Sequence, residues 1–118
     1  MIKYQIDNKT KKKLEKVLSK NKAYASTTFI IELKKMLAEA TGRAKIKSPI
    51  DTGNLRSSIG YDVISRKNLT FRALADYASF LEFGTRRQKA QPYFFGSLDK
   101  AKQNMMRRIN KALKQLNK

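Results

Sequence analysis

The chain has 118 residues, with 27 Lys and Arg against 9 Asp and Glu, and its net charge at pH 7 is +18. This length predicts one domain over residues 1–118, with a single modest core. The charge predicts an anionic partner, either nucleic acid, an acidic membrane or an acidic protein. The absence of Cys and His excludes disulfides, thiol nucleophiles, Cys/His zinc sites and the usual neutral-pH general base.

The N-terminal half is predicted to be mainly helical. Weak alternation near the start favours an edge strand or an arm over residues 1–8, and residues 11–20 then show one apolar helical face. A stronger helical pattern runs from about Lys22 to Lys47, with a stripe made of Phe29, Leu33, Leu37, Ala40 and Ala44. Pro49 disfavours helix at the residue before it, so this long helix is expected to end there. The first residues lack the apolar region of a signal peptide, and no apolar run approaches the ~18 residues of a membrane span, so we expect folding in the cytoplasm.

The second half combines an alternating segment with helical ones. Two alternating runs joined by the polar residues SRKN predict an antiparallel hairpin across residues 59–74. A short helix is predicted from Tyr77 to Phe83, ended by Gly84, and a long basic C-terminal helix is predicted to begin at Pro92. The expected fold class is therefore α+β: a small antiparallel sheet packed with the long helix before Pro49 and the long C-terminal helix.

The tripeptide Asp51-Thr52-Gly53 raises the question of catalysis, because aspartic proteases carry Asp-Thr-Gly at the catalytic carboxylate. That motif requires a second aspartate to share its proton, and an apolar strand normally leads into it. Here a basic helix and a proline precede it, and a turn explains the residues better: Asp51 accepts backbone N–H bonds and Gly53 permits a positive φ. The tripeptide is interpreted as a helix-to-strand junction. Asp51→Asn is accordingly expected to cause no enzymatic defect and to cost at most about 0.5–2 kcal/mol of stability.

Three blocks of sequence then occur in order between Ser48 and Leu98: SPIDTGNLRSSI, ADYASFLEFGT and AQPYFFGSL. Together they resemble three blocks of the small tail-component proteins of long-tailed bacteriophages, a family that includes minor tail protein Z-like proteins and acts in tail completion and head–tail joining. The third block departs from the family at Gly96-Ser97, where Pro-Ala is more usual. The matching positions are Asp51, Thr52, Gly53, Leu55, Arg56, Ser58 and Ile59 in the first block, Tyr77, Ala78, Glu82, Gly84 and Thr85 in the second, and Gln91, Pro92 and Phe94 in the third.

The resemblance implies a structural protein of the virion, located in the neck or tail and assembled in the cytoplasm of the bacterial host. It implies no catalytic residue, no metal and no cofactor. The implied partners are other copies of the chain in a ring and neighbouring phage connector or tail proteins, with packaged DNA as a further contact and no membrane. The matched residues are then determinants of fold and assembly.

Charged and aromatic residues near the second and third blocks suggest how such partners are met. Arg86, Arg87 and Lys89 form a basic loop that either contacts DNA or an acidic subunit, or is simply solvated. An ion pair between Arg56 and Glu82 is a hypothesis for a link between the first two blocks. The candidates for an apolar contact between ring subunits are Phe80, Phe83, Tyr93, Phe94 and Phe95.

Two alternatives stay open from the residues alone. A free-standing nucleic-acid-binding protein would explain the charge, although no helix-turn-helix, finger or RNA-binding motif occurs. A dimeric aspartic protease would explain the Asp-Thr-Gly tripeptide but not the sequence before it.

Overall fold

The computed structural model describes residues 1–19, 26–48, 54–65 and 68–116. The chain folds as α+β, as predicted, and the described part measures 54 × 26 × 22 Å. The elements in chain order are β1 (Ile2–Gln5), α1 (Asn8–Ser19), α2 (Ser26–Lys47), α3 (Asn54–Ser58), β2 (Ile59–Ser65), β3 (Asn68–Ala73), α4 (Ala78–Phe83) and α5 (Phe95–Leu116).

The three strands form an antiparallel sheet in the order β1-β3-β2. The predicted hairpin is present as β2 and β3, and Tyr61 lies opposite Phe71 in its register. On the other side of β3, Tyr4 lies opposite Phe71, so the N-terminal segment is an edge strand and not an arm. A chain segment from the very start of the sequence therefore completes the sheet.

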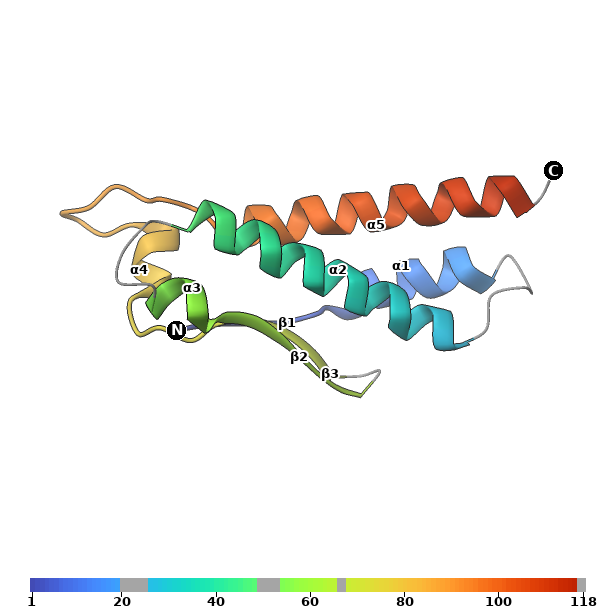
Figure 1. Cartoon of the computed structure of the whole chain (residues 1–118), viewed down its shortest axis with the longest axis horizontal. Coiled ribbons are helices and arrows are strands. Elements are labelled where there is room, and N and C mark those ends of the chain that lie inside the picture. The colour runs from blue at the N-terminus through green and yellow to red at the C-terminus, as the bar shows by residue number, and fades with distance from the viewer. Residues whose placement is uncertain (20–25, 49–53, 66–67, 117–118) are drawn as a thin grey trace.

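Two long helices, α2 and α5, run side by side along the molecule and cover one face of the sheet (Figure 1). The predicted stripe of α2 is buried at Leu33, Leu37, Ala40 and Ala44, while the side chain of Phe29 lies outside the described part of the chain. From α5, the residues Leu98, Ala101, Met105 and Ile109 are buried beside it. The ring of Phe94 stacks on that of Phe71 with centroids 4.1 Å apart, which joins the helical layer to the sheet.

The N-terminal ends of two helices differ from those expected from the sequence. Helix α1 begins at Asn8, ahead of the apolar helical face at residues 11–20, and of the candidate caps Asp7, Asn8 and Thr10 it is the Asp7 carboxylate that accepts the Thr10 N–H at 2.9 Å and caps the helix. Hydrogen bonds from the side chain and the backbone of Thr10 hold the pKa of the Asp7 carboxyl below its ordinary value. Helix α5 begins at Phe95, three residues after the predicted start at Pro92, because a side chain of α4 caps it there.

Candidate assembly surface

The three sequence blocks meet at one end of the molecule, where α3, α4 and the start of α5 lie together (Figure 1). The first two blocks are adjacent: Ser58 and Tyr77 line one depression of about 330 Å³. The Leu74 N–H also donates to the Ser58 carbonyl oxygen at 3.3 Å. Residues 54–58 and 74–77, distant in sequence, are thus held side by side.

The second and third blocks are joined by the carboxylate of Glu82, which is 6% exposed. Its Oε2 accepts the backbone N–H groups of Tyr93 at 2.7 Å and Phe94 at 3.0 Å, and its Oε1 accepts that of Phe95 at 3.0 Å. The first turn of α5 contains no acidic residue of its own. Because helix N-termini present unpaired N–H groups and attract negative charge, Glu82 acts as the cap of α5 from a different helix. This cap places the first turn of α5 at Phe95 and not at Pro92.

Tyr93 and Phe94 are part of the core. The Tyr93 hydroxyl donates to the Ala78 carbonyl oxygen at 3.0 Å, and burial together with the nearby Glu82 raises the pKa of that phenol. Both residues are almost fully buried, at 1% and 0% exposed. They hold α4 against the start of α5.

An eleven-residue loop between α4 and α5 begins at Gly84, which has φ +80° and ends α4 as predicted. A Cβ at this position would come within 2.8 Å of the Ala90 backbone nitrogen, so only glycine fits. The Thr85 hydroxyl oxygen accepts the Arg87 and Gln88 N–H groups at 3.3 and 3.1 Å, and the Gln91 N–H donates to Leu81 O at 2.7 Å. These bonds order the loop at both its tip and its base.

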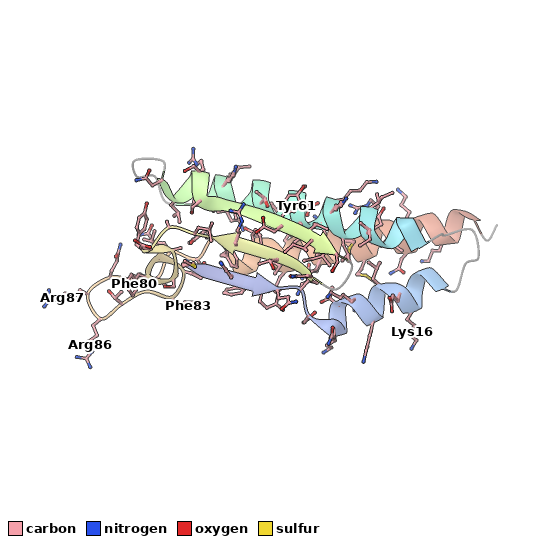
Figure 2. All side chains as sticks on the ribbon, turned by 90° about the horizontal axis from the view of Figure 1, so that it is seen from below. Lys16, Tyr61, Phe80, Phe83, Arg86 and Arg87 are labelled. Atoms are coloured by element: carbon pink, nitrogen blue, oxygen red, sulfur yellow. The ribbon has the colours of Figure 1, made fainter. Side chains whose placement is uncertain are left out.

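The solvent side of this end carries a mixed apolar and basic surface, which we call the tip surface: Phe80, Phe83, Arg86, Arg87 and Lys89. The two phenylalanines on α4 are 57% and 65% exposed, and all three basic residues of the loop are exposed. Figure 2 shows both phenylalanines and the two arginines at the same end of the molecule. Exposed aromatic rings beside arginines are typical of protein–protein contact surfaces.

The structure contradicts two expectations from the sequence. The ion pair between Arg56 and Glu82 is wrong, because the carboxylate is buried against backbone N–H groups and Arg56 is exposed. Of the five aromatic candidates for a subunit contact, Tyr93 and Phe94 are in the core and Phe95 is half-buried, which leaves Phe80 and Phe83. A cap supplied eleven to thirteen residues away has no local signature; the only signal was the lack of a capping residue in the sequence before α5.

The remaining matched positions divide into core and surface. Leu55 and Ile59 are buried, whereas Thr85, Gln91 and Pro92 are exposed. Asp51, Thr52 and Gly53, with their predicted turn, lie outside the described residues. Ahead of them the described chain is α2, a helix, where the protease motif would have a strand.

Neither a metal centre nor a membrane span emerges from the described ranges. No group of three or more Asp and Glu residues in them is placed to hold a metal ion. No helix in them is long and apolar enough to cross a membrane.

In the comparison with protein families, residues 6–84 match the HK97-gp10-like model of bacteriophage tail components. This range contains the first block and all of the second block except Thr85, and it ends two residues before the basic residue Arg86. No curated protein and no solved structure matches the chain.

Proposed function

Since the chain belongs to the HK97-gp10-like family of bacteriophage tail components, we propose that it forms a ring in the neck of the virion, where it joins head to tail or completes the end of the tail tube. Family membership makes the chain a structural protein of the phage particle. The ring, its position between head and tail, and assembly of the ring in the host cytoplasm are the proposed refinements.

The observation that carries the proposal is the tip surface. Ring contacts are heterologous, since one patch of each subunit meets a different patch of the next. Phe80 and Phe83 are exposed on a short helix whose position is fixed by the buried Glu82 cap and by the hydrogen bond from Tyr93 to Ala78. A preorganised pair of aromatic side chains can be buried by a neighbour at little cost in conformational entropy.

The charge of the chain limits how such a ring can close. Identical subunits that each carry +18 repel one another, so apolar contact area or an acidic neighbouring protein must offset the repulsion. Apolar contact is available at Phe80 and Phe83, and the flanking Arg86 and Arg87 suit an acidic connector or tail protein. The ring is therefore expected to close on an acidic partner, or at raised salt, where the repulsion between subunits is screened.

The direct test is the double variant Phe80→Ser/Phe83→Ser, compared with Ile46→Ser/Ile64→Ser. The control removes two exposed apolar side chains elsewhere, at 82% and 76% exposed. We expect the first variant to fold normally by circular dichroism but to lose self-association in sedimentation velocity, and to fail to restore tails to phage lacking the protein. The control should retain both. Loss of assembly in the control alone, or in neither variant, would contradict the role of the tip surface.

Nucleic-acid binding is the second candidate, favoured by one specific observation. Arg86, Arg87 and Lys89 all extend into solvent from a hydrogen-bonded loop at the end of the molecule. In a neck ring such a loop could contact packaged DNA, and in a free protein it could be the main binding element. Arg86→Ala/Arg87→Ala should then weaken duplex binding without altering self-association, whereas a neighbouring acidic subunit as the true partner would leave duplex binding unchanged.

A further inference from the structure

A second concave surface lies between α1 and α5, away from the tip surface. It is a groove of about 600 Å³, within the size range of ligand-binding sites. Four cationic side chains line it, Lys9 and Lys13 from α1 and Lys102 and Arg107 from α5, together with Met105 and Met106. Lys16, on the same helix as the first two lysines, lies at the opposite end of the molecule from Phe80 and Phe83 (Figure 2).

The charge of the groove is only partly neutralised within the described chain. Its one acidic lining residue, Asp7, interacts electrostatically with Lys102, caps α1 through the Thr10 N–H at 2.9 Å and accepts a hydrogen bond from the Tyr4 hydroxyl at 3.3 Å. Four cationic side chains against this one carboxylate leave the lining with a net charge of +3. Lys9, Lys13 and Arg107 form no ion pair with any residue in the described ranges. Lys and Arg side chains from two helices thus converge on one concavity, where a bound carboxylate would interact with several of them.

The two methionines indicate which kind of ligand the groove can bind. Met105 is fully buried and Met106 half-buried, so the base of the groove is a thioether surface that can adapt to an apolar side chain. A DNA phosphate gains nothing from contact with methionine, so the apolar base of the groove does not favour a duplex. Cations around an apolar base instead match a segment that carries both carboxylates and leucine-like side chains.

Another copy of this chain is a poor occupant. It has only 9 acidic residues, and most of those that the structure describes are engaged. Glu82 caps α5 and Asp7 caps α1. The carboxylates of Glu32, Glu39 and Asp62 pair with Arg108, Arg43 and Arg72.

We propose that the α1–α5 groove docks an acidic, amphipathic segment of a different protein, with its carboxylates on Lys9, Lys13, Lys102 and Arg107 and its apolar side chains on Met105 and Met106. This inference concerns a surface separate from the tip and does not depend on ring formation. A chain that remains monomeric can still bind such a segment.

The test uses three labelled probes with the intact protein: an amphipathic Glu/Leu peptide of about 12 residues, the same peptide with Ser for Leu, and a short DNA duplex. We expect the Glu/Leu peptide to bind at least about tenfold more tightly than the Glu/Ser peptide. Lys13→Glu/Arg107→Glu should weaken its binding by at least about tenfold, whereas Lys3→Glu/Lys34→Glu, exposed outside the groove and of equal charge change, should weaken it far less.

Two further measurements locate the contact without relying on a charge reversal. With ¹³C-methyl methionine, the Met106 signal should shift on adding the Glu/Leu peptide while that of Met36, buried on α2, should not. Met106→Ser should weaken binding of the Glu/Leu peptide and leave binding of the duplex unchanged. Equal binding of the two peptides, equal effects of the two charge reversals, or tightest binding of the duplex through the groove lysines would each overturn the proposal.

Discussion

At the scale of single residues, one carboxylate connects two of the sequence blocks. Glu82 is buried and accepts three backbone N–H groups at the start of α5, so its removal would leave those donors without partners inside the protein. Hydrogen bonds to a charged acceptor are stronger than neutral ones, and the helix dipole adds to the effect. The side chain therefore determines where α5 begins and how α4 is held.

The first prediction concerns this cap. Glu82→Gln keeps the shape but replaces one carboxylate oxygen by an NH₂ group that faces N–H donors, so we expect a loss of about 1–3 kcal/mol in the free energy of unfolding. Glu39→Gln, at a partly exposed pair with Arg43, is the control and should cost no more than about 1 kcal/mol. Urea unfolding of both variants measures the difference. Equal losses would show that the cap is energetically unimportant.

The second prediction uses the lowered pKa of Asp7. Because the folded state favours the ionised carboxylate, its contribution is present above the unfolded pKa of about 4 and is lost as pH falls through the folded value. Asp7→Ala should cost about 0.5–2 kcal/mol at pH 7, the usual loss for an N-cap. The difference between variant and wild type should shrink toward zero as the pH falls through the lowered folded pKa of Asp7. Thermal unfolding across that pH range tests it, and a gap that persists at low pH would mean that packing, not charge, is responsible.

At the scale of elements, a glycine inside α2 and the glycine that ends α4 have opposite physical roles. Gly42 lies inside α2, is exposed, and would have nothing within 4 Å of an added Cβ. Gly84 ends α4 with φ +80°, and an added Cβ there would meet the Ala90 backbone. Glycine inside a helix costs stability, whereas glycine at a positive φ avoids strain.

The third prediction is therefore that the same substitution, glycine to alanine, changes the free energy of unfolding in opposite directions at the two positions. Gly42→Ala should raise the free energy of unfolding by about 0.5–1 kcal/mol, because it removes conformational freedom from the unfolded chain without a clash. Gly84→Ala should lower it by about 1–3 kcal/mol. Denaturant midpoints of the purified variants suffice. A destabilised Gly42→Ala monomer would mean that an unseen close contact exists at that position on α2.

At the scale of the whole molecule, electrostatic repulsion opposes self-association and attraction favours binding to DNA. Both effects arise from the same net charge of +18, and both weaken as salt shortens the Debye length from about 10 Å at 0.1 M to about 3 Å at 1 M. Apolar contacts through Phe80 and Phe83 are not screened in this way. Rising salt therefore favours self-association and disfavours DNA binding.

The fourth prediction follows from that balance. Self-association should strengthen with rising salt, while DNA binding should weaken through loss of counterion release. Light scattering and a duplex-binding assay over one salt series measure both, with Phe80→Ser/Phe83→Ser as the variant that should not associate at any salt. A wild-type monomer at every salt that binds duplex tightly at physiological ionic strength would favour the nucleic-acid function over ring formation.

Four features could be predicted from the amino-acid sequence: the fold class, the hairpin across residues 59–74, a strand or an arm at the N-terminus, and the family. These features depend on local periodicity, on turn residues and on short ordered blocks, which are all written along the chain. Contacts between residues far apart in the sequence depend instead on tertiary packing. It paired Glu82 with the start of α5 and not with Arg56, and it buried Phe94 while leaving Phe80 and Phe83 in solvent. It also brought lysines of α1 opposite Arg107 of α5, because packing of the two helices, and not the spacing of charges in the sequence, creates that groove.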